Sequence, residues 1–548
     1  MGGGQMRARS IIAVFLILLP NDPAALGGTR VVLHLDKVLG QVDRRLFGNN
    51  VIGYQDSREQ YSQRGAGIWD PLEHKPVEEF VRLAKQAGIT VMRWPGGCEA
   101  HRFNWKRTVG PLDQRPNQAF GLPEFLTFCG AIGAKPLITL ADYWGTPADA
   151  ADLVEYLNAP NNGANPNGGT DYATLRTEDR HPEPYRVIWF EYGNETDHGD
   201  HKGVGDAAGP KSRRMSPAEY ARNYLAYRQA MHAVDPAVQL GGPLAYADVV
   251  PGWTQTVLEV AGPSMDFGVI HPYLPQLARS DPIPPEKVPP QTVALAALSC
   301  GPQIARSIHQ LQDMVRRTTG RAFLPLAATE YNGWFTQEKP VPYRQSLVNA
   351  IRNADMLAEI MAPDLHVFMA NFWQYSNEYW GMAAGYRHRH EPIVLQANYF
   401  VFQLYADFLP ELIAAEVHSD RFDFPGGLNV QPRSGEPTQE QQTEPHRPQN
   451  FGAVPYVSVN ASRSPQGDAV TAMVICRRLE STESVEFEMP QRFTRATTTT
   501  LTGPSFDSTN LQAPQTIGIR PLQVTGDAGR FTATLPPCSL TSVRFSTQ

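Results

Sequence analysis

The chain has 548 residues, of which 42% are hydrophobic and 19% are charged, and its formal net charge is −7. This length exceeds one ordinary domain and the composition is too apolar for a disordered protein, so we expect a large core domain and at least one smaller domain. The acidic balance, with an isoelectric point near 6.1, lacks the basic footprint of a nucleic-acid-binding protein. No interior stretch stays apolar for the roughly 20 residues of a membrane span, so we expect a neutral ligand, either small or polymeric.

The N-terminal segment has the organisation of a targeting sequence. The first ten residues, MGGGQMRARS, contain Arg7 and Arg9 but no acid, and the apolar run IIAVFLILLP follows them. The small residues Ala24 and Ala25 come next. This order predicts a signal peptide over residues 1–28, cleaved near residues 25 to 28, and hence a secreted or periplasmic protein.

From about residue 45 to 408, short apolar runs alternate with longer amphipathic ones, which is typical of a parallel β/α architecture. Pro76 and Gly88 bracket one predicted helix, and apolar residues at three- and four-residue spacing after Tyr343 predict another with one buried face. Eight strands with intervening helices predict a (β/α)8 TIM barrel with long loops. The eight candidate strands are 46–51, 89–94, 135–141, 187–192, 238–242, 267–271, 324–330 and 366–372.

Two loops of this barrel are long. The segment 158–170 precedes the fourth strand, and we interpret it as a surface insertion. The proline-rich segment 274–291 follows the sixth strand, on the side where TIM barrels carry their active sites, so we expect it to form a wall or lid.

The last part of the chain, 409–548, predicts a C-terminal β-sandwich, because short strands rich in Val, Thr, Phe and Ala alternate there with turn residues. The segment 29–44 contains a strand expected to add an edge to this sandwich. Cys476 and Cys538 both lie in the C-terminal part, and the sequence is compatible with a disulfide between them or with two free thiols. The candidate strands are 30–36, 469–475, 484–488, 494–501 and 530–535, and a polar loop is expected at 433–450.

Polar side chains follow several predicted strands, and two of them are glutamates, Glu195 and Glu330. In a TIM barrel, polar residues at the carboxyl ends of strands indicate function. Hydrolysis of a glycosidic bond needs two carboxyl groups, one protonated to donate to the leaving oxygen and one ionised to attack or to activate water. A chain with 55 acidic residues also places some glutamates at strand ends by chance. Glu195 and Glu330 occur on the same predicted rim as Asn194, His271 and Tyr273, which favours a catalytic role for the two glutamates.

An ordered set of motifs resembles the family 51 glycoside hydrolases, which are in the main α-L-arabinofuranosidases. The motifs, in chain order, are LFG (46–48), RWPGG (93–97), NW (104–105), VGP (109–111), EYGNE (191–195), HPY (271–273), TEYN (329–332), MANFWQ (369–374) and FQLY (402–405). Each motif alone is weak, but the ordered set is specific and spans essentially the whole mature chain.

The resemblance implies a retaining double displacement with Glu195 as general acid/base and Glu330 as nucleophile. It further implies that Asn194 binds the 2-hydroxyl of the sugar, that Tyr273 orients the nucleophile and that Arg93 keeps it ionised. No metal or cofactor is implied. The other residues expected to contact substrate are His271, Gln374, Trp373, Cys98 and Trp144.

The chain departs from the family pattern at three positions. Cys98 follows RWPGG where the family usually has Asn, and Tyr331 follows the nucleophile where it usually has Trp. Ile52 stands where arabinofuranosidases of this kind place a sugar-binding glutamate. Loss of a buried charged hydrogen-bond partner would cost about 2 to 4 kcal/mol for that sugar. The departures therefore leave the retaining mechanism in place and weaken the case for L-arabinofuranose as the substrate.

A cluster of acidic and histidine residues follows the EYGNE motif, and we interpret it as a polar rim of the site and not as a metal centre. Its members are Asp197, His198, Asp200 and His201, with His388 and His390 further on.

Three functions remain open on the sequence alone: an exo-acting furanosidase, an endo-acting glucanase or hemicellulase of the same family, and a carbohydrate-binding barrel without activity. Exposed Trp144, Trp334 and Trp380 in an open cleft would indicate a bound polymer, whereas a closed pocket would indicate exo action. The expected partner is an oligo- or polysaccharide, and a homo-oligomer is compatible with the sequence.

Overall fold

The computed structural model describes most of the chain. The described residues are 28–52, 67–115, 120–199, 215–244, 252–277, 289–335, 341–377, 380–384, 392–424 and 451–547. The predicted signal peptide, the centre of the 274–291 loop and the polar loop at 433–450 lie outside these residues.

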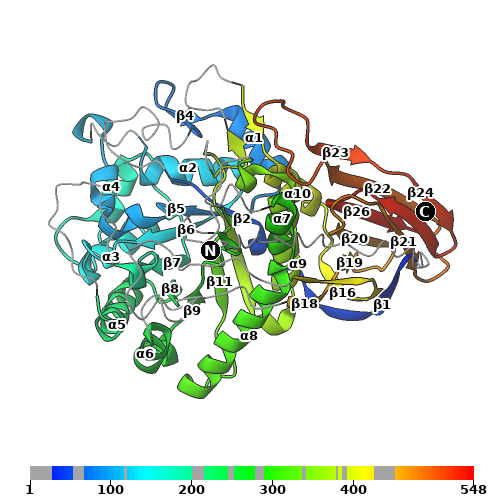
Figure 1. Cartoon of the computed structure of the whole chain (residues 1–548). Coiled ribbons are helices and arrows are strands. Elements are labelled where there is room, and N and C mark those ends of the chain that lie inside the picture. Colours follow the sequence, from blue (N-terminus) through cyan, green and yellow to red (C-terminus); the bar gives the residue numbers. More distant parts are fainter. Residues whose placement is uncertain are drawn as a thin grey trace, which may run out of the picture.

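A closed barrel of eight parallel strands forms the larger part of the molecule (Figure 1). All eight strand predictions are confirmed, although several strands are shorter than the apolar runs that indicate them. Leu46, for example, belongs to a 3-10 helix, Arg44–Phe47, that leads into the first strand. The barrel strands are β2 (Gly48–Asn50), β5 (Val91–Trp94), β6 (Lys135–Leu140), β7 (Trp189–Tyr192), β8 (Gln239–Pro243), β9 (Phe267–Val269), β11 (Leu326–Tyr331) and β13 (Val367–Phe372).

Helices cover the outside of the barrel. The first helix begins at Glu78 and not at Pro76, because Pro76 belongs to a short strand. The next residue, Val77, donates its N–H to the Ile68 carbonyl at 2.8 Å. The helices are α1 (Glu78–Gln86), α2 (Leu122–Ile132), α3 (Pro147–Asn158), α4 (Tyr172–Glu178), α5 (Pro217–Val234), α6 (Trp253–Val260), α7 (Pro290–Leu298), α8 (Cys300–Thr319), α9 (Leu347–Ile360) and α10 (Ala397–Tyr405).

Helix α9 corrects one prediction. The spacing of apolar residues after Tyr343 predicts a helix with a single buried face, yet nearly every side chain of α9 is buried, including Asn349, Arg352 and Asp355. The reason is its position between the barrel and the β-domain, where it contacts α8 and α10 on one side and β20 and β26 on the other (Figure 1). Its polar side chains therefore bond within the protein.

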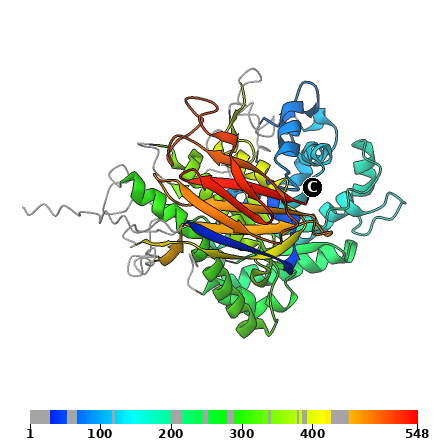
Figure 2. The same ribbon diagram turned by 90° about the vertical axis from the view of Figure 1, so that its right-hand side faces the viewer.

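The β-domain is built on a ten-stranded sheet, seen face-on in Figure 2. The expectation that the N-terminal strand β1 forms an edge is wrong, because β1 has a neighbouring strand on each side. Strand β1 pairs antiparallel with β16 and parallel with β21. The sheet order is β23 (Gly518–Pro521), β22 (Arg495–Thr502), β26 (Ser539–Ser546), β20 (Ala469–Cys476), β19 (Val457–Arg463), β16 (Glu411–His418), β1 (Thr29–Gln41), β21 (Glu483–Glu488), β25 (Arg530–Leu535) and β24 (Val524–Asp527).

The sheet folds over on itself into two layers. Phe545 of β26 lies 5.4 Å from Phe487 of β21 and 5.2 Å from Phe531 of β25, measured between ring centroids. Strands are about 4.8 Å apart in a sheet, so five steps along a flat sheet would separate β26 and β21 by about 24 Å. The ring contacts therefore lie in a core between two layers, as in a sandwich.

The described part of the chain also contains four pairs of shorter strands. The pair β10–β12 joins the start of the 274–291 loop to the segment that follows β11, with Gln276 opposite Trp334. The pairs are β3 (Trp69–Asp70) with β4 (Lys75–Pro76), β10 (Gln276–Leu277) with β12 (Trp334–Phe335), β14 (Ala383–Ala384) with β15 (Val394–Leu395), and β17 (Arg421–Phe424) with β18 (Phe451–Pro455).

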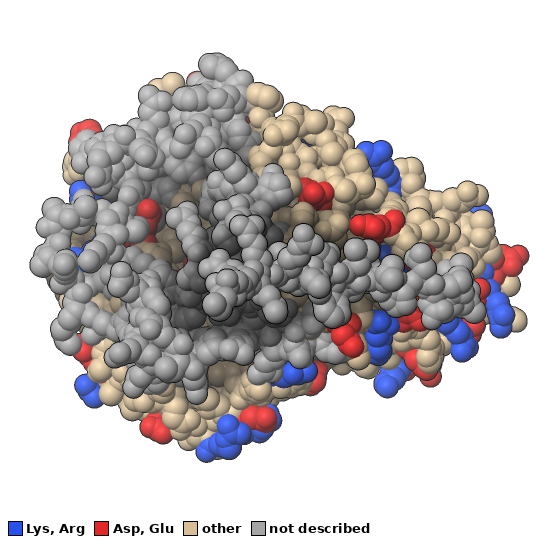
Figure 3. Space-filling view, viewed as in Figure 1, with Lys and Arg blue, Asp and Glu red and all other residues tan. Residues whose placement is uncertain are grey.

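Three further expectations concern the surface and the thiols. The segment 158–170 lies mostly exposed between α3 and α4, as expected for a surface insertion. Cys476 and Cys538 are free thiols, and both are buried. Among the described residues no helix is both long and apolar enough to cross a membrane. On the described surface visible in Figure 3, acidic and basic side chains are interspersed along the lower edge and the β-domain.

Candidate active site

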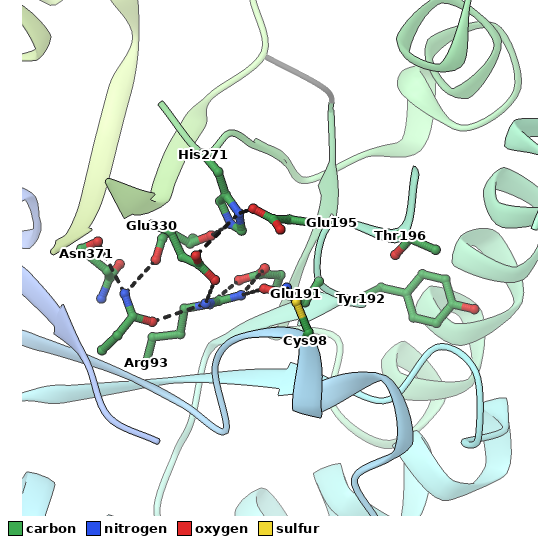
Figure 4. Close-up of polar contacts among 12 residues, drawn as sticks. Arg93, Cys98, Glu191, Tyr192, Glu195, Thr196, His271, Glu330 and Asn371 are labelled. Carbon is green, nitrogen blue, oxygen red and sulfur yellow. Dashed lines mark hydrogen bonds and ion pairs between the residues drawn. The ribbon is translucent and has the colours of Figure 1, made fainter. Parts of the chain in front are cut away.

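The carboxyl ends of the barrel strands bring the predicted site residues together. Arg93 lies in β5 and Glu330 in β11, while Glu195 follows β7 and His271 follows β9. Figure 4 shows their side chains converging, with the His271 ring between the two glutamates. The arrangement is that of a TIM-barrel active site, in which different strands each supply one group.

Arg93 is fully buried at the centre of this cluster, and each of its five N–H donors meets an acceptor. Glu191 accepts two of these bonds, from Nε at 2.8 Å and from Nη2 at 2.7 Å. Glu330 accepts from Nη1 at 2.9 Å, Asn50 from Nη1 at 3.1 Å and Asn194 from Nη2 at 2.7 Å. The guanidinium group therefore bonds residues from the ends of three other strands, β2, β7 and β11.

Burial alone would lower the pKa of Arg93, but the neighbouring Glu191 and Glu330 carboxylates more than offset this effect and raise its pKa. Arg93 therefore stays charged. Glu191 and Asn50 were not among the predicted site residues, although both bond Arg93. The sequence does indicate Glu191, because it is a charged residue inside an otherwise apolar strand. A buried guanidinium group also needs more hydrogen-bond acceptors than one glutamate supplies.

Glu330 is held by two donors. Besides Arg93, the hydroxyl of Tyr273 donates to its Oε2 at 2.7 Å. Burial and the adjacent Glu330 raise the pKa of Tyr273 well above its usual value, so the phenol keeps its proton and remains a donor. These two hydrogen bonds hold the Glu330 carboxyl group in place at the end of β11.

Glu195 lies on a tight turn after β7. Its backbone is in the left-handed region with φ of 48°, where residues other than glycine rarely occur. Its Oε1 lies 2.8 Å from Nδ1 of His271, and Nε2 of that ring lies 2.9 Å from Oγ1 of Thr329. Burial lowers the pKa of His271, although Glu330 acts in the opposite direction, so the ring is neutral at pH 7. The ring can therefore share one proton with Glu195.

The two glutamates are close enough to act on one bond. Oxygens of Glu195 and Glu330 and Nδ1 of His271 all lie within 4.8 Å of one another. These three atoms could also ligate a cation. Arg93, however, already supplies a positive charge to Glu330, and His271 already bonds Glu195. Of the histidine cluster predicted as a rim, Asp197 is buried, and Asp200, His201, His388 and His390 lie outside the described residues.

Most of the other predicted contact residues border this cluster. Asn194 is buried, and its Nδ2 lies 4.0 Å from the half-buried thiol of Cys98. Trp373 lies against Gly97, where an added Cβ would come within 2.8 Å of its ring, so only glycine fits. Gln374 is buried directly after it.

Trp144 is not part of this cluster. Its side chain is 43% exposed, and it lines a separate apolar cavity between β6 and α3 together with Trp105 and Leu153. The cavity walls belong to the barrel and its helices and include none of the carboxylates described above. Trp144 therefore lines this cavity, and its contact with substrate stays a prediction.

Helix α9 supports the segment that carries His271 and Tyr273. Arg352 is fully buried and donates from Nε to the Leu274 carbonyl at 2.5 Å and from Nη2 to the Pro272 carbonyl at 3.1 Å. These carbonyls flank Tyr273, so Arg352 holds the backbone on both sides of the phenol that bonds Glu330.

Comparison with known proteins identifies relatives over almost the entire chain. Residues 83–250 match the model of an α-L-arabinofuranosidase 1 domain, and residues 329–539 match that of an α-L-arabinofuranosidase C-terminal domain. An exo-α-(1→6)-L-arabinofuranosidase of Bifidobacterium longum is 24% identical, over 95% of this chain and 98% of its own length. An intracellular exo-α-(1→5)-L-arabinofuranosidase of Acetivibrio thermocellus is 26% identical over 44% of this chain and 48% of its own.

A solved structure shares the fold of both domains. The family 51 α-L-arabinofuranosidase of Bifidobacterium longum superposes with a TM-score of 0.75 and 19% identity, over 94% of this chain and 99% of that one. At this identity the likeness shows the fold, whereas the two family models, which together cover more than half of the chain, show the family. The chain belongs to the α-L-arabinofuranosidase-like glycoside hydrolases of family 51.

Proposed function

We propose that this glycoside hydrolase is an exo-acting α-L-arabinofuranosidase that works by a retaining double displacement. The observation that carries the mechanism is the pair Glu195 and Glu330, whose oxygens lie within 4.8 Å of each other. Retaining enzymes have carboxyl groups about 5 to 5.5 Å apart, whereas inverting enzymes need about 6.5 to 9.5 Å to admit a water molecule.

The surroundings of the two groups support different roles. Glu330, with its two donors, is suited to attack the anomeric carbon and form the glycosyl-enzyme. Glu195 hydrogen-bonds a neutral imidazole, which suits a group that must be protonated at the start of the cycle. Glu195 donates its proton to the leaving oxygen and then removes one from the water that cleaves the glycosyl-enzyme.

Asn194 is placed to bind the sugar 2-hydroxyl. Its Oδ1 accepts from Arg93, which leaves the amide N–H groups directed away from the guanidinium and toward the region of Cys98. Hydrogen bonds to the 2-hydroxyl strengthen in the transition state, so this contact would contribute to the rate as well as to binding.

Exo action is supported by the aromatic side chains beside the nucleophile. Trp334 and Trp380 pack against each other with ring centroids 5.2 Å apart, and both contact Tyr273. Strand pairing between β10 and β12 ties the start of the 274–291 loop to Trp334. These contacts favour a pocket that accepts a chain end, in place of an open row of tryptophans along a polymer.

The activity is tested with a panel of aryl glycosides: α-L- and α-D-arabinofuranosides, a β-galactofuranoside, a β-xyloside and a β-glucoside. We expect hydrolysis of the α-L-arabinofuranoside with release of the α-anomer as first product, observed by proton NMR. If another furanoside were hydrolysed fastest, the proposed sugar would be wrong and the retaining mechanism would stand. This is the first alternative to examine, because Ile52 and Cys98 depart from the family pattern. Initial release of the inverted anomer would refute the mechanism.

Three further features belong to the proposal. Residues 1–28 would direct secretion, the barrel would span 45–408, and residues 29–44 and 409–548 would form the β-domain. N-terminal sequencing of protein recovered from the periplasm or medium of an expressing bacterium tests the leader. Light scattering of the same material tests whether the protein forms a homo-oligomer.

A further inference from the structure

A second buried cluster lies on the opposite side of the turn that carries Glu195. Strand β7 ends at Tyr192, and the turn continues through Gly193, Asn194 and Glu195 to Thr196. In Figure 4 the Glu195 carboxylate points toward His271, whereas the Thr196 side chain lies on the other side of the chain. The direction of Glu195 therefore depends on what holds the residues on either side of it.

The residue before Glu195 is fixed by the catalytic cluster, since Asn194 accepts a hydrogen bond from Arg93 at 2.7 Å. The residue after it is fixed by Asp142, which follows β6. The hydroxyl of Thr196 donates to Oδ2 of Asp142 at 2.5 Å, and both side chains are buried. Glu195 thus sits in its left-handed conformation between two anchored neighbours, and that conformation would relax if either anchor were lost.

Asp142 is itself held by a second group. Its other oxygen, Oδ1, lies 2.7 Å from Nδ1 of His101, and neither side chain has appreciable exposure. Because a carboxylate only accepts hydrogen bonds, Nδ1 of the imidazole carries the proton. Each oxygen of the buried carboxylate therefore has a donor, which a buried carboxylate requires.

The packing leaves this cluster no freedom to rearrange. A Cβ on Gly193 would lie 2.5 Å from Oδ2 of Asp142 and would also clash with Thr196, and Gly193 has φ of 79°. On the other side, the Tyr143 hydroxyl donates to the Thr196 carbonyl at 3.3 Å, and its ring packs edge-on against His101. Asp142 can therefore bond Thr196 only when the turn has the backbone seen here.

We propose that Asp142 and His101, acting through the hydroxyl of Thr196, are positioning residues that aim Glu195 at the leaving-group oxygen. The inference rests on the proposed role of Glu195 as general acid/base. Asp142 and His101 lie in two other loops of the barrel and touch neither the substrate nor the reacting atoms; they act only on the direction of Glu195.

The test compares two substrates with the same sugar and different leaving groups. A 4-nitrophenyl glycoside needs little proton donation, whereas a phenyl glycoside depends on it, and kcat/KM reports the step in which this bond breaks. Thr196→Val removes the hydroxyl and keeps the shape. We expect it to lose about 10-fold more kcat/KM on the phenyl glycoside than on the 4-nitrophenyl glycoside, because a misplaced acid forfeits part of its roughly 10²- to 10⁴-fold contribution.

Two variants serve as controls for Thr196→Val. Thr196→Ser keeps the hydroxyl and should restore the ratio of the two kcat/KM values to that of the unmodified enzyme. Thr139→Val makes the same substitution at a buried position of β6 whose hydroxyl has no hydrogen-bond partner among the described residues, and it should leave both values unchanged. Asp142→Asn should shift the ratio in the same direction, and combining it with Thr196→Val should add little, since both act through one hydrogen bond.

Equal losses on the two glycosides in Thr196→Val, or no loss, would overturn the inference, because a purely structural role lowers both values together. Glu195→Ala separates this failure from failure of the proposed function. If Glu195→Ala lowers kcat/KM equally on the phenyl and 4-nitrophenyl glycosides, then Glu195 is not the general acid. In that case the proposed function is wrong in its assignment of Glu195.

Discussion

Arg93 at the mouth of the barrel and Arg477 at the contact between barrel and β-domain are both buried arginines with two acidic neighbours. Arg93 faces Glu191 and Glu330, and all five of its donors are used. Arg477 pairs with Asp355 of α9, and Glu359 lies one turn further along the same helix.

The two groups differ in how well the charges are balanced. At the mouth, the carboxylates raise the pKa of Arg93 despite its burial. At the domain contact, burial raises the pKa of Asp355 even though Arg477 opposes it. Burial and the adjacent Asp355 together raise the pKa of Glu359 to about 7. A buried charge is maintained only where enough oriented partners surround it. Arg93 at the barrel mouth therefore stays charged, whereas the charge of Glu359 at the domain contact changes with pH.

Removal of the nucleophile should have the largest effect. We expect Glu330→Ala to lower kcat on the order of 10⁴-fold or more, because no other group can form the covalent intermediate. Steady-state kinetics on the best aryl glycoside measure the loss, and circular dichroism checks that the variant is folded. Residual activity within 10-fold of the unmodified enzyme would remove Glu330 from the mechanism.

Replacing Arg93 tests directly whether its positive charge balances the two buried carboxylates at the barrel mouth. Arg93→Met leaves two buried carboxylates without their cation, so we expect a loss of about 3 to 5 kcal/mol in the free energy of unfolding together with at least a 100-fold loss of kcat/KM. Urea unfolding and kinetics give the two quantities. Arg93→Lys should recover only part of each, since an ammonium group cannot reproduce the fork of five donors. Full recovery by lysine would show that charge alone matters there.

Tyr273→Phe removes one donor from Glu330 and leaves the ring in place. We expect kcat to fall by about 10- to 100-fold, since a hydrogen bond to a charged group contributes about 1.5 to 3 kcal/mol. Tyr331→Phe provides the matched control, because the Tyr331 hydroxyl is buried without a hydrogen-bond partner among the described residues. Equal effects of the two substitutions on kcat would argue against the contact with Glu330.

The smallest effect is expected at the domain contact. The folded-state pKa of Glu359 is about 7, above the ordinary value of 4.5, so the protonated form is favoured in the folded protein. Its contribution to stability is therefore full below about pH 4.5 and is lost as the pH rises through 7. Glu359→Gln should be about 2 kcal/mol more stable than the unmodified enzyme at pH 8 and similar at pH 4.5.

Urea unfolding of Glu359→Gln at the two pH values measures this difference, and kcat should stay unchanged because Glu359 is remote from the site residues. A stability difference that does not vary with pH would contradict the contrast between the two arginine groups.

The sequence was sufficient for the barrel and for the two glutamates. The barrel strands are short, mostly apolar runs, and several of them have polar residues at or just after the carboxyl end, so the strand count and many of the rim residues follow from local pattern. Arg93, Glu195, His271, Tyr273 and Glu330 meet as the ordered motifs predict.

What the sequence could not supply depends on contacts between distant segments. Asp142 and His101 lie 41 residues apart, and their bond to each other and to Thr196 follows only from the packing of three loops. Helix α9 shows an amphipathic spacing, but its complete burial arises from the β-domain that covers it. Trp144 follows a strand as the site residues do, yet it lines a cavity whose walls include residues of α3 and none of the site carboxylates.

The central claim, that Glu330 is the nucleophile of a retaining reaction, is tested most directly by trapping the intermediate. In Glu195→Ala the second step is slowed because no general base activates water, while a 4-nitrophenyl glycoside still reacts in the first step. Acid quenching followed by peptide mass spectrometry should find one sugar attached to the peptide containing Glu330, and azide should release it as a glycosyl azide of retained configuration. A sugar on any other residue, or an azide product of inverted configuration, would contradict the account.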